Sequence, residues 1–469
     1  MPVAQRLSGE DLSILALENA TVAGHTCKVI LVQGQLDAAQ LRSSIAGRLD
    51  RAPRLRLRLA ERDGEPWWVP GPELDLTEQV VPAGPAGAGD DAGLRAAVAG
   101  IFAQHLDRSR PLWRIDVISG LDGGRSAAVW RIHHALADGM TAMSLASAVL
   151  WDDAPPTAPR QRSRPAAPAG PSRGPHLLAD VRSVAREAPQ PWHRSPFDGH
   201  IDARRSVAFS SAGLGALRQV CHATGGATVN DAVLTVVAGG LHRWLEAHHG
   251  HLGAVRVKVP VSLHNAAGPE HGGEAGNRDS FFCLDLPLGA ADPLDRLTAI
   301  RHATKVRKRG HDAQHLDACM RQLARVPPLG HFAERALSHA RSFALNVSNV
   351  PGPRQPVRVL GRPVLAMYSL AEIGTHHALR IAVVSLADSL NFGLVADPTL
   401  LDDVDQLAAS LHAEAAALTA CLPRALARQD WPHVRSATGR PAGGRGRGPL
   451  CGFRPTSAGL LPLRRPAKS

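Results

Sequence analysis

Two periods of apolar and polar residues run through the chain, and together they predict a mixed α/β protein. Apolar side chains at every third or fourth position predict helices over 37–49 and 93–106. Short apolar runs rich in β-branched residues predict strands, because such side chains pack well on a pleated sheet. These strands are Cys27–Gly34, Ser126–Ile132, Val255–Leu263, Phe281–Leu288 and His377–Leu386.

The helix with the strongest pattern spans 228–247. Thr228 precedes Asp231 by three residues, which is the spacing of a capping box. The residues that follow are apolar on nearly every side, so we expect this helix to be buried. Asn230 and Asp231 would cap the helix on the simplest interpretation, and Asp231 fits that role well.

A proline-rich join divides the chain into two globular halves. Nine prolines stand between Pro155 and Pro191, and proline is excluded from helix interiors and central strands. Inside the join, His176–Glu187 is amphipathic, which favours a short helix packed on a domain over one lying at a lipid interface. We therefore predict a first subdomain over 1–152, a crossover linker over 153–195, a second subdomain over 196–430 and a tail over 431–469.

Composition and charge argue against two classes of protein. Hydrophobic residues make up 44% of the chain, which is enough for a sizeable core and excludes general disorder. The formal net charge is +11, but eight of the 53 basic residues and no acidic residue lie after residue 430. Without that tail, 45 basic residues face 42 acidic ones, a net charge of +3, so a nucleic-acid-binding function loses its main support. The tail itself is rich in Gly, Pro and Arg, a composition typical of disorder.

The sequence also predicts where the protein resides. Its six cysteines are scattered without a C-x-x-C pair, which fits neither a zinc ribbon nor a dense disulfide framework. Glu10 and Asp11 stand where a signal peptide needs an unbroken apolar stretch. No run of 18 apolar residues predicts a transmembrane helix. We expect a reduced, cytoplasmic protein.

The strongest chemical signal is the segment from Arg131 to Gly139, which reads RIHHALADG. A predicted strand leads into His133 and His134, and Asp138 with Gly139 opens an apolar helix. A histidine at the end of a strand can present one ring nitrogen to a cleft, and its ordinary pKa of about 6.5 suits it to accept a proton at neutral pH. Three interpretations stand at this point: satisfied loop histidines, a metal site of two imidazoles and a carboxylate, or a general base that deprotonates a hydroxyl.

The pattern His-His-x-x-x-Asp-Gly resembles the motif of the bacterial wax ester synthase/diacylglycerol acyltransferases, within the larger group of CoA-dependent acyltransferases. Its His-x-x-x-Asp core has low specificity, so the flanking elements decide. They occur in the family's order from about Leu7 to Asp402. They are Leu7-Ser8 with Asp11, Pro53, Trp68, Asp75-Leu76, Leu106-Asp107-Arg108, Pro111-Leu112-Trp113, Asn230-Asp231, Val259-Pro260-Val261-Ser262, Gly276-Asn277 and Asn349-Val350-Pro351-Gly352-Pro353.

Four positions depart from the family pattern. Leu74 replaces the aromatic residue that is common before Asp75, and Gln79 stands near an expected histidine. Arg114 follows Pro-Leu-Trp where an acidic residue is usual, and His264 stands where arginine is usual. None of them touches the histidine motif, so they bear on substrate preference or competence more than on reaction type.

The resemblance implies an α/β (α+β) fold of two subdomains, like that of chloramphenicol acetyltransferase, with mixed sheets and a central tunnel. His134 would lie at the midpoint of the tunnel as general base, and His133 would support the loop. Asp138 would anchor the loop without contacting substrate, and Gly139 would permit a tight turn at the helix start. For Asn230 two roles stay open: a tunnel residue that donates to the oxyanion, or a helix cap.

The implied activity is that of an acyl-CoA-dependent O-acyltransferase: a diacylglycerol O-acyltransferase that makes triacylglycerol, a long-chain-alcohol O-fatty-acyltransferase that makes wax esters, or both. Acyl-CoA would be a co-substrate, and we expect neither a metal nor another cofactor. Because such acceptors do not dissolve in water, we expect peripheral contact with the inner membrane surface or lipid inclusions. Two alternatives stay open: a condensation-domain-like acyltransferase that uses a carrier-protein thioester, and a catalytically inactive lipid-binding homologue.

The densest basic cluster in the predicted body has two possible roles. Its cations are suited to the phosphates of CoA or to anionic lipid headgroups. A solvated helix face is the more common outcome for such a run, so we do not assign a binding site to it. The cluster consists of Arg301, Lys305, Arg307, Lys308 and Arg309.

Overall fold

The computed structural model of the chain describes residues 4–71, 74–85, 87, 89–152, 187, 195–248, 250, 254–262, 279–323 and 342–427. All of them belong to one unit, which spans Met1–Gln429. The predicted tail over 431–469 lies outside the described residues, as does the predicted linker except for Glu187 and Ser195. The amphipathic segment His176–Glu187 therefore stays a prediction, and so do the subdomain boundaries.

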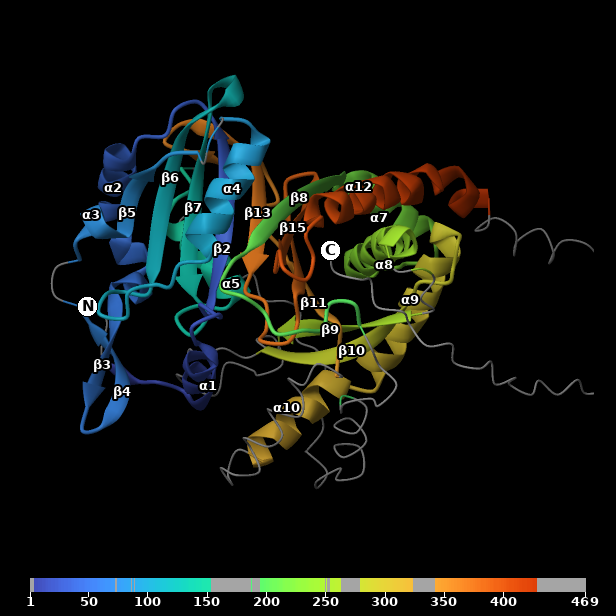
Figure 1. Ribbon diagram of the computed structural model, residues 1–469, viewed down its shortest axis with the longest axis horizontal. Coiled ribbons are helices and arrows are strands. Elements are labelled where there is room, and N and C mark those ends of the chain that lie inside the picture. Colours follow the sequence, from blue (N-terminus) through green and yellow to red (C-terminus); the bar gives the residue numbers. More distant parts are fainter. Residues whose placement is uncertain are drawn as a thin grey trace, which may run out of the picture. The chain divides into compact units, whose positions relative to one another are not determined.

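The first large sheet has six strands, and two of them come from the second half of the chain (Figure 1). β13 pairs antiparallel with β2, which places Tyr368 opposite Val29. The strands predicted at Cys27–Gly34 and Ser126–Ile132 are confirmed as β2 and β7. The order is β12 (Arg358–Val359), β13 (Arg362–Ala371), β2 (His25–Gln33), β7 (Arg125–His133), β6 (Trp113–Leu121) and β5 (Val80–Ala83).

The second large sheet also has six strands, and it is mixed. β11 runs parallel to both of its neighbours, whereas the other pairs are antiparallel. Three predicted strands are confirmed here as β9, β10 and β14. The order is β10 (Asp279–Pro287), β9 (Ala254–Ser262), β11 (Leu345–Val350), β14 (Leu379–Leu386), β15 (Ser389–Ala396) and β8 (Ser206–Gly213); a separate small sheet contains β1 (Gln5–Arg6), β4 (Glu65–Pro70) and β3 (Leu57–Arg62).

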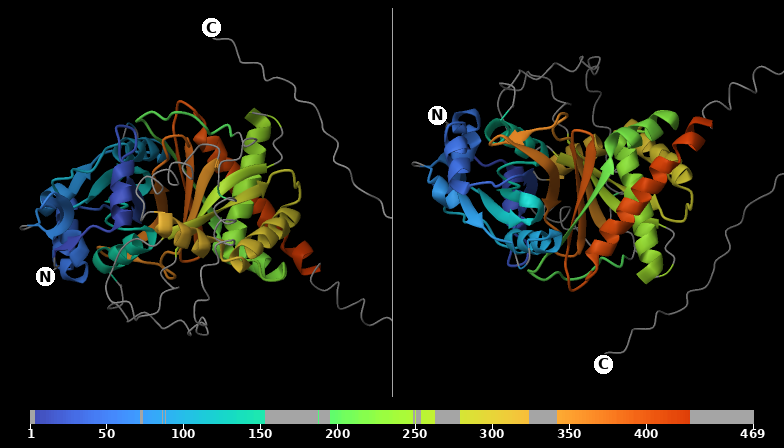
Figure 2. Two further views of the ribbon diagram at one scale, coloured as in Figure 1. Left: turned by 90° about the horizontal axis from the view of Figure 1, so that it is seen from below. Right: turned by 90° about the horizontal axis from the view of Figure 1, so that it is seen from above.

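Helices cover both sheets. α2 and α5 bury apolar side chains on one face of the first sheet, and α4 does so on the other. α7, α8, α9 and α12 cover one face of the second sheet (Figure 2). Among the described helices, none combines the length and apolar character needed to cross a bilayer. The α-helices are α1 (Gly9–Leu17), α2 (Ala38–Ala46), α3 (Leu76–Gln79), α4 (Asp91–Phe102), α5 (Gly139–Val149), α7 (Leu214–Ala223), α8 (Val229–His248), α9 (Pro293–Arg309), α10 (Asp312–Leu323) and α12 (Val404–Ala420), with 3-10 turns at Leu49–Arg51, Pro53–Arg56 and Asp122–Gly124.

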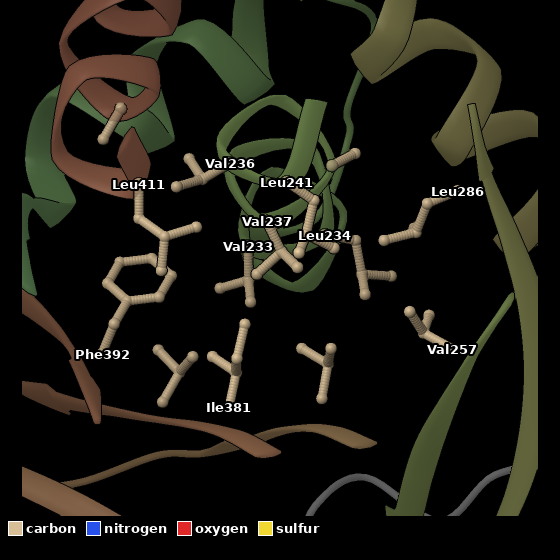
Figure 3. Packing of buried hydrophobic residues seen from close by; sticks show 14 of the residues in the cluster. Val233, Leu234, Val236, Val237, Leu241, Val257, Leu286, Ile381, Phe392 and Leu411 are labelled. Carbon is tan, nitrogen blue, oxygen red and sulfur yellow. The ribbon is translucent and has the colours of Figure 1, made fainter. Parts of the chain in front are cut away.

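α8 is the centre of the second core, as its apolar pattern predicts. The predicted capping box is confirmed: Thr228 N donates to Asp231 Oδ2 at 2.8 Å, and Asp231 N donates to Thr228 Oγ1 at 3.2 Å. Val233 and Val237 are fully buried and pack among side chains of β9, β10, β14, β15 and α12 (Figure 3). Each such side chain contributes about 1.5–3 kcal/mol when it is fully buried.

The opposite face of the second sheet meets the first sheet at β13. Gly393 in β15 lies so close to β13 that a Cβ there would stand 2.1 Å from the carbonyl oxygen of Ser369. Val395 on β15 packs in the same apolar cluster as Cys27 of β2, whereas Val384 on β14 packs in the cluster that contains α5. The two halves of the chain are therefore joined through this face.

Candidate active site

The predicted histidine segment forms the turn between β7 and α5. His133 is the last residue of β7, and Gly139 is the first residue of α5. Backbone hydrogen bonds hold the turn: His133 N donates to Leu112 O at 2.9 Å, and His134 N donates to Gly24 O at 3.0 Å. The turn is thus attached to two neighbouring segments rather than projecting as a free loop.

His133 is enclosed, and both of its ring nitrogens face protein groups. Its Nδ1 accepts a hydrogen bond from Ala135 N at 3.1 Å, and its Nε2 lies 3.3 Å from Glu18 Oε2. Arg108 donates to the same carboxylate oxygen at 2.6 and 3.0 Å. Burial alone would raise the pKa of Glu18, but His133 and Arg108 outweigh burial and lower that pKa to about 2. These contacts fix the ring of His133 in one orientation, which suits a residue that holds the turn in place.

A glycine makes room for the ring of His133. Gly24 has a φ of +67°, and a Cβ at this residue would stand 2.7 Å from His133 Nε2. Any side chain at this position would therefore both strain the backbone and push the imidazole from its place. Neither Gly24 nor Glu18 was singled out from the sequence, because nothing in their local surroundings indicates contact with a residue so far along the chain.

His134 has surroundings different from those of His133. The residue is partly exposed, whereas His133 is buried, so His134 is the less enclosed of the two. Burial, and next the positive charge of Arg380 on β14, lower the pKa of His134 to about 4, against an opposing contribution from Asp138. The imidazole is therefore neutral at physiological pH, which is the form that can accept a proton. Arg380 comes from the second half of the chain, so both halves form the surroundings of this ring.

Asp138 caps α5 and is buried. Its Oδ1 accepts a hydrogen bond from Thr141 N at 2.6 Å, which satisfies one of the free N–H groups at the helix start. Arg54 lies near enough for its charge to interact with that of Asp138. Burial lowers the pKa of Arg54, and the negative charges of Asp11 and Asp138 oppose that effect. Arg54 Nε also donates to the carbonyl of Leu136 in the turn.

The reason for glycine at position 139 differs from the predicted one. Gly139 is not in the left-handed region of φ, so no tight turn requires it. A Cβ at Gly139 would instead stand 2.8 Å from Val350 Cγ2. The helix start and the end of β11 approach each other closely, and this approach joins the histidine segment to the Asn349–Pro353 motif.

Asn230 lies in the first turn of α8 and is half-buried. In this turn Asp231 makes the hydrogen bonds: its Oδ1 accepts from Thr304 Oγ1 at 2.7 Å, and its Oδ2 belongs to the capping box. Asp231 therefore has the capping role that its position predicts. Among the residues that the structure describes, no hydrogen bond links Asn230 to the histidine turn, so its part in catalysis stays a prediction.

Two departures from the family pattern have structural partners. Gln79 is buried, and its Nε2 donates to Pro111 O at 2.9 Å. Arg114 Nε donates to Asp116 Oδ1 at 3.0 Å, while the other oxygen of Asp116 accepts from buried Arg131 at 3.0 Å. Both residues thus stabilise the strands that lead to the histidine turn. Leu74 packs at the edge of the apolar cluster of the first subdomain, and His264, Gly276 and Asn277 lie outside the described residues.

The basic cluster on α9 divides into half-buried and exposed members. Arg301 donates to the carbonyls of Thr224 and Gly225 at the end of α7. Arg307 pairs with Glu187 at 2.9 Å and with Asp312 at 2.6 Å. It lines a cavity of about 390 Å³, and its charge there is balanced by these carboxylates. The remaining members, Lys305, Lys308 and Arg309, are exposed.

Two further predictions stay without a test. The cavities described in the structure are not lined by His134, and they neither support nor oppose a central tunnel. Within the described ranges, no group of three or more His, Cys, Asp or Glu side chains is arranged to hold a metal ion. The expectation that the reaction needs no metal therefore stays a prediction.

Comparisons with known sequences cover both halves of the chain. Residues 7–186 match the wax ester synthase/diacylglycerol acyltransferase catalytic domain, and residues 275–419 match the C-terminal domain of the same proteins. A Mycobacterium tuberculosis protein assigned as a diacylglycerol O-acyltransferase is 31% identical over 458 residues, which cover 87% of this chain and 96% of that protein. A Mycobacterium bovis protein with the same assignment is 33% identical over 392 residues, covering 74% and 76%.

Solved structures support the fold. The wax ester synthase/diacylglycerol acyltransferase from Marinobacter aquaeolei VT8 has a TM-score of 0.66 at 24% identity, covering 89% of this chain and 100% of that one. The starter condensation domain of rhizomide synthetase has a TM-score of 0.55 at 14% identity, covering 91% and 95%. The predicted fold, that of the CoA-dependent acyltransferases with mixed sheets, is confirmed.

Proposed function

This chain belongs to the wax ester synthase/diacylglycerol acyltransferase family of acyltransferases, and we propose that it transfers a fatty acyl group from acyl-CoA to diacylglycerol, to a long-chain alcohol, or to both. Diacylglycerol is the acceptor in the names of its mycobacterial relatives, so we propose triacylglycerol formation as the main reaction. We also propose that the reaction needs no metal, and that the protein meets its acceptors at a membrane or lipid surface.

One observation carries this proposal: His134 is neutral and only partly buried as a residue, at a turn that its neighbours hold in place. Its imidazole would take the proton from the acceptor hydroxyl as the oxygen attacks the thioester carbonyl. The tetrahedral intermediate would then collapse with cleavage of the C–S bond, and the imidazolium would return the proton to the leaving thiolate. A base positioned in this way contributes about 10²–10⁴-fold to the rate.

The other members of the motif support the base without touching substrate in this proposal. His133 and Glu18 hold the turn from one side, and Asp138 fixes the helix start on the other. Asn230 is a proposed donor to the oxyanion, since an amide N–H can stabilise the charge that develops on the carbonyl oxygen. The helix-cap alternative for Asn230 predicts instead that its replacement changes stability and leaves the rate per folded molecule unchanged.

The pH dependence of kcat/KM should have its acid limb near pH 4. Only neutral His134 accepts a proton, so the rate falls as the pH drops through the pKa of this ring. Replacing Arg380 with methionine removes a positive charge, which should raise that pKa and move the limb to higher pH. The measurement is restricted to the pH range in which circular dichroism shows the folded protein. A wild-type limb at about pH 6.5, the ordinary value for histidine, would contradict this assignment.

A product assay tests the proposed reaction. Labelled palmitoyl-CoA is offered with dioleoylglycerol and hexadecanol together, both in phospholipid vesicles, and the labelled esters are separated. We expect triacylglycerol as the main product, a rate that EDTA leaves unchanged, and protein that sediments with the vesicles. A faster reaction with a carrier-bound acyl donor would favour the condensation-domain-like alternative. Vesicle binding without any ester would favour the inactive lipid-binding homologue.

A further inference from the structure

The two faces of β11 have different surroundings. Leu345 and Val347 are buried in the core under α8, so the alternate residues, Asn346 and Ser348, stand on the opposite face. Val350 lies on that same opposite face, and it is the residue that closely approaches Gly139. The face that carries Asn346 and Ser348 is therefore the one turned toward the histidine turn.

Asn346 stands in a row between two cations. The register places it beside Lys258 on β9 and beside Arg380 on β14. Lys258 Nζ lies 3.9 Å from the centroid of the Phe281 ring, and Arg380 Nη1 donates to Glu372 O at 2.8 Å. Arg380 is also a cation whose charge lowers the pKa of His134, so this end of the row lies within electrostatic range of the proposed base.

The side-chain oxygen of Asn346 is buried but makes no hydrogen bond to any residue that the structure describes. A buried polar atom without a hydrogen-bond partner destabilises the protein. Such an atom is normally found only where a ligand or a water molecule supplies the missing hydrogen bond. An oxygen of this kind needs a hydrogen-bond donor. The side chains of Lys258 and Arg380 are themselves hydrogen-bond donors. They suit a ligand in which a carbonyl oxygen lies next to the N–H group that Asn346 would bind.

We propose that Asn346 Oδ1 accepts a hydrogen bond from an amide N–H of the pantetheine arm of acyl-CoA, with Lys258 and Arg380 facing the adjacent amide carbonyls. This inference rests on the proposed function. Among the ligands of that reaction, the fatty acyl chain and the ester groups of diacylglycerol offer no donor. The acceptor hydroxyl does offer one, but it must lie at His134. Asn346 is four residues, or about 13 Å, along β11 from Val350, so it stands away from the end of the strand that approaches Gly139, and we assign it to the donor arm.

Two acyl donors distinguish a specific contact with the pantetheine arm from a general effect of the substitution on activity. One is palmitoyl-CoA, and the other is S-ethyl thiopalmitate, which carries the same thioester but no amide. Asn346→Ala should lower kcat/KM for palmitoyl-CoA by about tenfold, mainly by raising KM, because one hydrogen bond to a buried group is lost. The same variant should change the rate with S-ethyl thiopalmitate less than about twofold, since that donor makes no such bond.

Matched variants and a binding measurement complete the test. Ser348→Ala changes the next residue on the same face and should leave both donors unaffected, whereas Asn346→Asp keeps an acceptor oxygen and should retain more activity than Asn346→Ala. Calorimetry with CoA alone should show the tenfold loss of affinity in Asn346→Ala without any turnover. Circular dichroism confirms that each variant is folded.

The inference is overturned if Asn346→Ala affects both donors equally, affects neither, or raises KM for the acceptor alcohol instead of the donor. The last result would assign Asn346 to the acceptor hydroxyl. A wild-type protein that binds CoA through Asn346 but forms no ester would leave this inference standing and reject the proposed function. If the wild-type protein forms ester and Asn346→Ala binds CoA as tightly as the wild type, the proposed function stands and this inference is rejected.

Discussion

Replacing His134 with alanine should lower the rate of ester formation from palmitoyl-CoA and dioleoylglycerol by about 10²–10⁴-fold. The reason is that the acceptor hydroxyl would lose the neutral imidazole of His134, the less enclosed histidine of the described turn. His133 cannot take over, because its ring is enclosed between the N–H of Ala135 and the carboxylate of Glu18. The rate is measured with labelled acyl-CoA at saturating acceptor.

The control for this change is His222→Ala. His222 lies exposed in the last turn of α7, and its loss should alter neither the rate nor the melting temperature. The fold of His134→Ala should also be retained, since the helix cap and the backbone bonds of the turn do not use the imidazole. Loss of a general base should leave no more than about a hundredth of the wild-type rate. A folded His134→Ala variant that keeps more than about a tenth of that rate would therefore reject the proposed role.

Gly352→Ala should destabilise the protein by about 3 kcal/mol or more, at the upper end of single substitutions. A Cβ at Gly352 would stand 2.1 Å from the carbonyl oxygen of Ser385 and 3.0 Å from Met367 Cε. The first of these is a backbone atom within the β14 strand, so it cannot rotate away. Gly352 N also donates to Ser385 Oγ at 3.1 Å, and a displaced segment would lose that bond.

Gly100→Ala is the matched control for this substitution. Gly100 lies in α4 with nothing within 4 Å of a built Cβ, so alanine should raise stability by up to about 1 kcal/mol through its better helix propensity. Both variants are measured by urea denaturation. If Gly352→Ala unfolds within about 0.5 kcal/mol of the wild type, the range expected for neutral surface changes, then the Asn349–Pro353 segment is not held against β14 as described. Any such displacement should also reach the histidine turn, because Val350 contacts Gly139.

Local signals in the sequence were sufficient for much of the fold. The helix α8 follows from an apolar pattern and from the Thr228–Asp231 spacing, both contained within about twenty residues. The strand β7 and the turn after it follow in the same way, and the flanking motifs then identify the family. These features are predictable because periodicity and capping depend on neighbours along the chain.

The exchange of β12 and β13 into the first sheet is not predictable from such signals. Nothing in the residues of β13 indicates that they pair with β2 rather than with their neighbours in sequence. The need for glycine at position 139 is likewise not predictable from local sequence, because it depends on Val350, which comes from a strand in the other half of the chain. Strand pairing and close packing are contacts between distant segments, and a local pattern carries no information about them.

The sequence by itself determined the two histidines, the capping aspartate and the order of motifs that identifies the family. The tertiary structure alone decided which histidine is the less enclosed, because Glu18, Gly24 and Arg108 enclose His133, while the charge of Arg380 acts on His134. It also decided that Asn346 lies between two cations, since that row exists only where β9, β11 and β14 are side by side. Chemistry that depends on burial and on charges from separate strands is set when the two halves come together, and not before.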